Sequence, residues 1–174
     1  LFPHHESEIA QSTICNHTAP VKYWMHNNMI TINGRKMGKS YNNVIKLSEL
    51  FSGSHEILTQ AYTPMTVRFF ILQTHYRSTL DFSNEALQAA EKGFRRMWDA
   101  FTLLKKFNIT AGVEATDVAL EKQCSDILHA LDDHMNDDIN TAKVLAGLFE
   151  LVPVINSIKD GQDRKSTRLN SSHT

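Results

Sequence analysis

The chain beyond residue 83 repeats apolar side chains every three or four positions, a spacing typical of amphipathic helices. Ser83 precedes the longest of these stripes as a candidate N-cap. Its apolar positions are Leu87, Ala90, Phe94, Met97, Trp98, Phe101 and Leu104. Two further stripes predict helices over about 120–135 and from about Thr141 onward, with Pro153 expected to kink or restart the last one. We expect these helices to pack on one another as a bundle.

Residues 1–40 show a different pattern, which predicts a segment of α/β structure. Pro3 suits the first turn of a helix, because its missing N–H costs nothing there, and we expect that helix to end near Cys15. After a polar loop, Met29 to Ile32 form a short apolar run that predicts a strand. The Asn33-Gly34 pair is a turn signal that ends the strand.

Residues 41–82 predict short helices between turn signals. Ser48 can cap a short helix that Gly53 ends, and another short helix is expected over 55–62. Thr63-Pro64 combines a capping residue with a first-turn proline, so it predicts the start of the next helix. This part would connect the α/β segment to the bundle.

These patterns divide the chain into an α/β segment over 1–40, a helical connecting region over 41–82, a helical bundle over 83–161 and a tail over 162–174. The tail ends in "DRKSTRLNSSHT", which abandons the preceding periodicity and resembles the translation of a sequencing adapter. A natural disordered tail is the alternative. Because the chain also begins at Leu-Phe-Pro without an initiator Met, we expect both ends to be cut.

The composition is that of an ordinary globular protein, with 174 residues of which 41% are hydrophobic and 21% charged. A net charge of −1 predicts no general affinity for nucleic acid, so any RNA contact must come from local patches. The two cysteines, Cys15 and Cys124, are far apart and predict neither a disulfide framework nor a thiol metal cluster. We expect a monomer in a reducing cytoplasm, with no apolar run long enough to span a membrane.

Residues 33–40, "NGRKMGKS", end like a phosphate-binding P-loop, but the glycine at their start stands one position too close to the second. A shorter ring cannot present the same backbone N–H groups to a phosphate, so the P-loop interpretation is weak. Two lysines three positions apart on a glycine-containing loop, Lys36 and Lys39, would still suit a polyphosphate whose charge moves during a reaction. A solvated basic turn after a strand is the alternative.

His4 and Glu8 are four positions apart on the first predicted helix, so both side chains lie on one face and can converge on one ion. Imidazole nitrogen and carboxylate oxygen are both zinc ligands, and this pair would form half of a site. The alternative is that the acidic residue is favoured near the helix N-terminus by the macrodipole and binds nothing.

Two segments in their order and separation, "FPHHESEIAQS" and "YWMHNNMITINGRKMGKS", resemble the cysteinyl-tRNA synthetases, which belong to class I of the aminoacyl-tRNA synthetases. The likeness continues through "HYRSTLDFSNEALQAA" and "ALDDHMNDDINTAKVLAGLFEL", and so covers residues 1–161. The resemblance implies a mainly α chain: a C-terminal remnant of a Rossmann-like α/β catalytic domain, followed by a helical bundle. It also implies an enzyme that activates L-cysteine with ATP and transfers it to tRNA(Cys).

The resemblance implies that residues 36–40, here called the lysine loop, bind ATP. "KMGKS" matches the family's KMSKS loop, which closes over ATP, supplied with Mg²⁺, and stabilises the pyrophosphate leaving group. Lys36 and Lys39 match its two catalytic lysines, and Lys36, Met37, Gly38, Lys39 and Ser40 together match its ATP-binding segment. Gly38 departs from the family's serine, which removes a hydroxyl and adds backbone freedom, so we expect loop closure to carry a larger entropy cost.

The family also binds zinc through two cysteines, a histidine and a glutamate, and His4 and Glu8 match the last two. Both family cysteines precede this segment, and Cys15 follows the motif, so it is no substitute. Zinc would take the substrate thiol as thiolate, a soft ligand that the hydroxyl of serine cannot imitate.

Four residues between the loop and the bundle are candidates for contact with the tRNA acceptor arm: Arg68, His75, Tyr76 and Arg77. Arginine can grip a phosphate through two parallel hydrogen bonds. Ordinary helix-surface and buried polar roles are the alternative for all four.

Three functions remain open at this stage. The first is a fragment of a cysteine-tRNA ligase, which alone should be inactive because the HIGH motif, the two cysteine ligands and the anticodon-binding region are not in the chain. The second is a ligase that joins cysteine to an amino-sugar in thiol biosynthesis, which shares the activation chemistry. The third is a non-enzymatic helical module that binds RNA or a protein.

Overall fold

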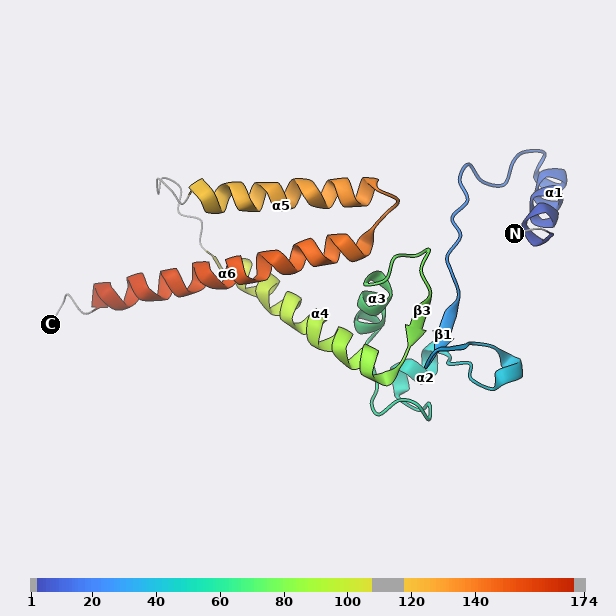
Figure 1. Cartoon of the computed structure of the whole chain (residues 1–174), viewed down its shortest axis with the longest axis horizontal. Helices are drawn as coiled ribbons and strands as arrows, with labels where there is room; N and C mark the ends of the chain where they lie inside the picture. Colours follow the sequence, from blue (N-terminus) through green and yellow to red (C-terminus); the bar gives the residue numbers. More distant parts are fainter. Residues whose placement is uncertain (1–2, 108–117, 171–174) are drawn as a thin grey trace.

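The computed structural model describes residues 3–107 and 118–170, with side chains described as far as residue 158 (Figure 1). The described part is mainly helical and contains one small sheet, as the sequence predicted. Its elements in chain order are α1 (His4–Asn16), β1 (Ile30–Ile32), β2 (Arg35–Lys36), the 3-10 helix η1 (Lys39–Tyr41), α2 (Leu47–Ser52), α3 (Pro64–Leu72), β3 (Leu80–Phe82), α4 (Asn84–Leu104), α5 (Val118–Asn136) and α6 (Thr141–Asn170).

The three strands form a sheet in the order β2-β1-β3. β1 and β2 are antiparallel and pair Thr31 with Lys36, which makes the predicted turn at Asn33-Gly34 a hairpin turn. β1 and β3 are parallel and pair Thr31 with Asp81. The connection between them runs through α2 and α3. The strand β3, from the predicted connecting region 41–82, therefore pairs with β1, from the predicted α/β segment 1–40. The pattern of residues had indicated β1 alone, because β2 and β3 are too short to show a period.

Both predicted caps at the start of α3 and α4 are confirmed. The Thr63 hydroxyl accepts a hydrogen bond from the backbone N–H of Thr66, and Pro64 occupies the first helical turn. The Ser83 hydroxyl accepts in the same way from the N–H of Ala86. Each cap satisfies a backbone donor that the helix itself leaves without a partner.

The core lies where α3 and α4 pack on the sheet. Leu87 is fully buried on α4, and Val67 and Phe70 on α3 are 3% and 6% exposed. Phe70 meets Phe82 of β3 edge-on, with ring centroids 4.8 Å apart. The predicted stripe on α4 is therefore the core-facing side of that helix at its first half, while Trp98, Phe101 and Leu104 towards its end are half-exposed.

The segment 55–62 is not a helix, so that prediction was wrong. Its backbone donors are used elsewhere: the N–H of Thr59 donates to the Asn84 side-chain oxygen, and the N–H of Tyr62 donates to the carbonyl of Leu50. The Tyr62 hydroxyl also donates to the Asn84 oxygen, at 2.8 Å, and Tyr62 is only 2% exposed. Long-range partners therefore outweigh the local helical pattern in this segment.

α2 begins two residues earlier than predicted, with Lys46 at the N-cap in place of Ser48. The Glu49 carboxylate accepts from the backbone N–H of Lys46 at 2.8 Å, which satisfies a free donor at this end. Gly53 ends the helix as expected, with a left-handed φ of 72° and its N–H donated to the carbonyl of Glu49.

α5 and α6 run side by side as a helical hairpin, and α6 also packs against α4 (Figure 1). Pro153 lies inside α6, which continues to Asn170, so the proline does not restart the helix. The helix thus extends into the residues that the sequence set apart as a non-native or disordered tail. The foreign origin of that tail stays a prediction.

One part of α6, Thr141–Ile158, is long and apolar enough to cross a membrane by length and composition. The expectation that no apolar run reaches this length was therefore wrong. A core helix of a soluble protein passes the same test, so length and composition alone do not assign a membrane span to α6. Here the helix packs against α4 and α5, and Val152 and Val154 are buried.

α1 stands apart from the other helices at the end of a long extended segment (Figure 1). It begins one residue after Pro3, which takes the N-cap position, and ends at Asn16, close to the predicted Cys15. None of its residues is buried.

Candidate functional site

The turn before the lysine loop is fixed by one carboxylate. Asn33 and Gly34 adopt left-handed φ angles of 49° and 77°. The Asp81 Oδ1 atom on β3 accepts from the backbone N–H of Gly34 at 2.8 Å and from the Thr31 hydroxyl at 2.6 Å. Because these bonds join β3 to the hairpin, the turn has a set direction relative to the sheet.

The lysine loop itself is held by the side chain of Asn43, which bonds the backbone on both sides of Met37. Its Oδ1 atom accepts from the N–H of Gly38 at 2.9 Å, and its Nδ2 atom donates to the carbonyl of Lys36 at 3.0 Å. Met37 is half-buried against the core, and its N–H donates to the carbonyl of Ile30 at 3.2 Å. Within the described residues the loop is therefore anchored through its backbone and through Met37.

The lysine side chains remain exposed. Lys36 lies on β2 and Lys39 begins η1, and Ser40 beside it is exposed as well. Lys39 borders a polar cavity of about 500 Å³, whose other lining residues include Lys46, Glu49 and His55. Two cationic groups on an anchored loop beside a polar cavity can approach the phosphates of a ligand.

Gly38 does not need the conformational freedom of glycine in this structure. Its φ of −174° is extended backbone that any residue adopts. A Cβ atom at this position would lie 3.3 Å from the Tyr41 ring, so a side chain here requires a small shift of that ring. The expected entropy cost of loop closure stays a prediction.

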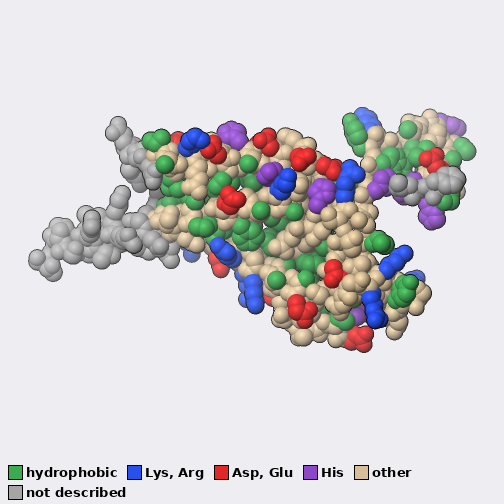
Figure 2. All heavy atoms as spheres, in the orientation of Figure 1, with side chains coloured by type: hydrophobic (Ala, Val, Ile, Leu, Met, Phe, Trp, Pro, Cys, Tyr) green, Lys and Arg blue, Asp and Glu red, His purple; other side chains and the backbone are tan. Residues whose placement is uncertain are grey.

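His4 and Glu8 lie one turn apart on α1, and both are exposed. Among the described residues no group of three or more His, Cys, Asp and Glu side chains could hold a metal. Histidines gather at this end of the molecule (Figure 2), but His5 stacks on His26 and Trp24, with ring centroids 4.7 and 5.5 Å apart. The His4–Glu8 pair fits half of a zinc site by ligand chemistry and spacing, and the stacked rings are a separate cluster.

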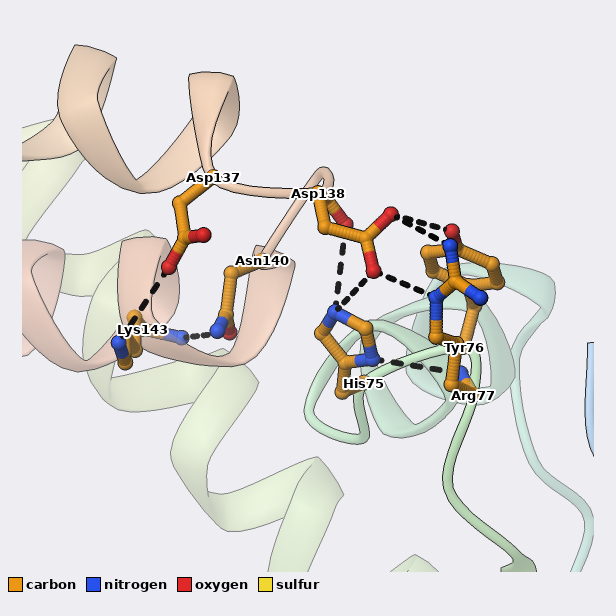
Figure 3. A network of polar contacts seen from close by, with 7 residues as sticks. All are labelled: His75, Tyr76, Arg77, Asp137, Asp138, Asn140 and Lys143. Carbon is orange, nitrogen blue, oxygen red and sulfur yellow. Dashed lines mark hydrogen bonds and ion pairs between the residues drawn. The ribbon is translucent and has the colours of Figure 1, made fainter. Parts of the chain in front are cut away.

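Three of the four candidate tRNA contacts come together, and one does not. Arg68 is exposed on α3. His75, Tyr76 and Arg77 follow one another in the turn between α3 and β3, and all three face the carboxylate of Asp138, in the turn between α5 and α6 (Figure 3).

The bonds to Asp138 are short and charge-assisted. Arg77 Nε donates to its Oδ2 at 2.5 Å and Arg77 Nη2 to its Oδ1 at 3.1 Å, while the Tyr76 hydroxyl donates to Oδ1 at 2.5 Å. His75 Nε2 lies 3.2 Å from the Asp138 carbonyl oxygen. The bonds from Arg77 and then Tyr76 lower the pKa of Asp138 to about 2.

Sequence analysis missed three residues that organise the site: Asn43, Asp81 and Asp138. Asn43 carried a local signal, since the Asn42-Asn43 pair follows the loop directly and Asn favours turns. Four of the five residues at 136–140 are Asn or Asp, which predicts a turn for the same reason. Asp81 and Asp138 act on partners far along the chain, which no local pattern shows.

Two family models match the chain: "tRNA synthetases class I (C) catalytic domain" over residues 1–92 and "DALR domain" over residues 130–173. The first therefore includes α1, the lysine loop and the turn at 75–77. The second includes the turn that carries Asp138.

Curated proteins of similar sequence carry the name cysteine-tRNA ligase. The protein from Cytophaga hutchinsonii is 51% identical over 174 residues, which is 100% of this chain and 35% of that protein. The protein from Bacteroides fragilis is 54% identical over 163 residues, 94% of this chain and 32% of that protein. The protein from Porphyromonas gingivalis is 54% identical over 164 residues, with 93% and 32% covered. The chain spans about a third of the length of the curated relatives it matches.

Proposed function

The chain belongs to the family of class I (C) tRNA synthetase catalytic domains, and on that premise we propose that it is the part of a cysteine-tRNA ligase that handles ATP and contributes half of a zinc site. Its similarity to proteins named cysteine-tRNA ligase supports this specificity. The remaining two thirds of such a protein would supply the other half of the metal site and the first half of the nucleotide site.

The proposed reaction has two steps. A carboxylate oxygen of cysteine attacks the α-phosphorus of ATP, the bond to the bridging oxygen breaks, and pyrophosphate leaves with the electron pair. A terminal hydroxyl of the tRNA then attacks the carbonyl carbon of the adenylate, loses its proton and releases AMP. Lys36 and Lys39 would stabilise the negative charge that develops on the leaving pyrophosphate in the first step.

The observation that carries this proposal is the way the lysine loop is held. Asn43 fixes the backbone on both sides of Met37, yet the two lysine side chains stay exposed. A solvated basic turn would not need an anchored backbone. An anchored backbone limits the positions that the two exposed lysine side chains can reach, which lowers the cost of ordering them beside a phosphate.

Zinc, if bound, would be held on this chain by the imidazole of His4 and the carboxylate of Glu8. It would supply a soft site for the substrate thiol, which serine cannot match. The chain's own contribution is the α-helical spacing of these two ligands on one exposed face.

We also propose, on the same premise, the fold of the catalytic part, the domain division, the localisation and the tRNA contacts. We take the small sheet as the remnant of a Rossmann-like domain, with its parallel β1–β3 pair joined through helices. We also keep the division at residues 40, 82 and 161, a monomer in the cytoplasm, tRNA(Cys) as partner and Arg68, His75, Tyr76 and Arg77 as tRNA-facing residues. The bonds to Asp138 give three of these four a structural role in this structure.

The relatives' names favour a tRNA ligase over a ligase that joins cysteine to an amino-sugar. A non-enzymatic helical module is disfavoured by the anchored lysine loop, which such a module would not need.

A chimera tests the proposal. Residues 1–161 of this chain would replace the matching segment of the Cytophaga hutchinsonii protein, and cysteine-dependent exchange of pyrophosphate into ATP would be measured. We expect exchange with cysteine and far less with serine, and we expect Lys39→Ala to lower the rate about 100-fold, by the magnitude of losing one preorganised charge.

Lys106→Ala is the matched control, because Lys106 is an exposed lysine that belongs neither to the lysine loop nor to the lining of the cavity that Lys39 borders. It should leave the exchange rate close to that of the unaltered chimera. Equal rates for Lys39→Ala and the unaltered chimera, with both folded by circular dichroism, would remove the assigned role. A folded chimera without exchange would reject the function.

A further inference from the structure

The turn at His75–Arg77 and Asp138 form a polar cluster that is separate from the lysine loop (Figure 3). It joins residues that are 61 to 63 positions apart in the sequence. It also joins the part of the chain matched by the catalytic-domain model to the part matched by the DALR model. We call this cluster, formed by His75, Tyr76, Arg77 and Asp138, the clasp.

The backbone at the clasp is held in an unfavourable conformation. Asp138 and Ile139 adopt left-handed φ angles of 57° and 55°. This region is disfavoured for a β-branched residue such as isoleucine, and it persists only where the surroundings over-determine it. Three neighbouring side chains bind Asp138, and the Thr141 hydroxyl donates to the carbonyl of Leu72 at 2.8 Å, so the turn is tied to the end of α3 on two sides.

Hydrogen bonds also connect the clasp to the segment just before β1, the strand that leads into the lysine loop. The N–H of Asn28 donates to the carbonyl of Tyr76, and the Asn28 side chain donates to the carbonyl of Arg77, both at 2.9 Å. Asn28 Oδ1 in turn accepts from the N–H of Met29, one residue before β1. Tyr76 and Arg77 therefore bind Asp138 through their side chains and Asn28, just before β1, through their backbone carbonyls.

We propose that Asp138 is a positioning residue, which fixes the α5–α6 hairpin against the His75–Arg77 turn and, through Asn28, against the strand that carries the lysine loop. The proposal rests on the proposed function in naming tRNA as the substrate that depends on this orientation. A macromolecular substrate that contacts both parts senses their relative placement, whereas ATP and cysteine bind within one of them. Both carboxylate oxygens of Asp138 accept hydrogen bonds from Tyr76 and Arg77, so Asp138 would act through these two residues.

The first test is independent of function and uses amide hydrogen exchange of this chain. In Asp138→Asn we expect exchange at Asn28 to become about three- to tenfold faster, the range for losing a networked, half-exposed charge. Asp137→Asn is the matched control, because Asp137 lies in the same turn and only approaches Lys143, at 3.8 Å. Equal exchange at Asn28 in the two variants, or no protection of Asn28 in the unaltered chain, would overturn the proposal.

A second variant separates the clasp from backbone strain. Asp138→Gly removes the carboxylate but accepts a left-handed φ without cost. If the clasp positions the hairpin, Asn28 is deprotected in this variant as in Asp138→Asn. If relief of strain restores the protection of Asn28, the proposal is wrong.

The third test measures both steps of the reaction in the chimera described above. For Asp138→Asn we expect the KM for tRNA to rise about tenfold, a loss typical of misplaced substrate contacts, with pyrophosphate exchange unchanged. An equal loss in both steps, or in neither, would contradict the positioning role. A chimera that shows no activity but keeps the effect on Asn28 exchange would reject the proposed function and leave the clasp standing.

Discussion

The core around α3 and α4 and the segment around α1 differ in what holds them. Leu87 and Ala90 of α4 are 0% and 1% exposed, whereas no residue of α1 is buried. The residues that fold this chain and those that would bind its ligands are thus largely separate sets. The difference teaches that the candidate ligand groups are placed by local backbone geometry: helical spacing for His4 and Glu8, and an anchored hairpin for the two lysines.

The largest expected effect lies in the core. Leu87→Ala leaves a cavity among fully buried side chains and should lower the free energy of unfolding by about 2–5 kcal/mol. Urea denaturation of the purified chain would measure this loss. Leu104→Ala is the matched control on the same helix, since Leu104 is 47% exposed and should cost clearly less. Similar losses for both variants would show that α4 is not divided into a core half and an exposed half.

Alanine substitutions at two glycines, one after α2 and one in the hairpin before the lysine loop, compare the stability of the two regions. Gly53 and Gly34 have similar left-handed φ angles, 72° and 77°. A Cβ atom at Gly53 would lie 2.6 Å from the Ala61 backbone nitrogen, while one at Gly34 would meet nothing within 4 Å.

Alanine at Gly34 should therefore cost only the left-handed penalty of about 1–2 kcal/mol. Alanine at Gly53 should cost more, because the backbone near Ala61 must also shift. Chemical denaturation of the two variants would measure the difference, and equal costs would show that the 53–61 contact is loose.

The pH dependence of stability tests the clasp, which lies between the two regions. The pKa of Asp138 is lowered from 3.8 to about 2, by the hydrogen bonds from Arg77 and Tyr76 and, less, by the charge of Arg77. A lowered pKa in the folded state adds stability above the unfolded value of 3.8, and this stability is lost as the pH falls through about 2. The difference in melting temperature between the unaltered chain and Asp138→Asn should thus be largest at about pH 6, shrink below about pH 4 and disappear only below about pH 2.

Asp137→Asn serves again as the control, since its carboxylate is exposed and 3.8 Å from Lys143. A gap for Asp138→Asn that stays constant as the pH falls would contradict a charge-dependent clasp.

The smallest effect is expected at α1. His4→Ala and Glu8→Ala should each change the free energy of unfolding by less than about 0.5 kcal/mol, because exposed side chains without buried contacts contribute little. The measurement is the same urea titration, in metal-free buffer. A loss close to that of Leu87→Ala would show that α1 packs more tightly than its exposure indicates and would remove the contrast between the two regions.

The sequence predicted those features that are local. Ser83 and Thr63 cap their helices as expected because a cap bonds only two or three residues ahead. The period of α4 and the start of α6 were predicted for the same reason. The clearest failure involves distant partners: 55–62 gives its donors to Leu50 and Asn84 instead of forming a helix. The misplaced start of α2, by contrast, is local, since Lys46 and Glu49 set it.

The same distinction applies to the candidate site. The turn signal at Asn33-Gly34 predicted that both lysines follow the strand β1, but it did not show that Lys36 lies on the second strand of a hairpin. The partner of Arg77 did not, because Asp138 lies 61 positions away and looks like any turn aspartate. The resemblance to a family identified the lysine loop, whereas its hydrogen bonds to Asn43 and those of the preceding turn to Asp81 are seen only in the structure.

The parallel pairing of β1 with β3 has a consequence for synthesis. Thr31 and its partner Asp81 are 50 positions apart, so the hairpin that carries the two lysines has no third strand until translation has passed that point. At roughly 5–20 residues per second, the ribosome takes about 3–10 s to cover this distance. During that interval β1 has no partner on its β3 side, so the three-stranded sheet can form only after residue 82 has been made.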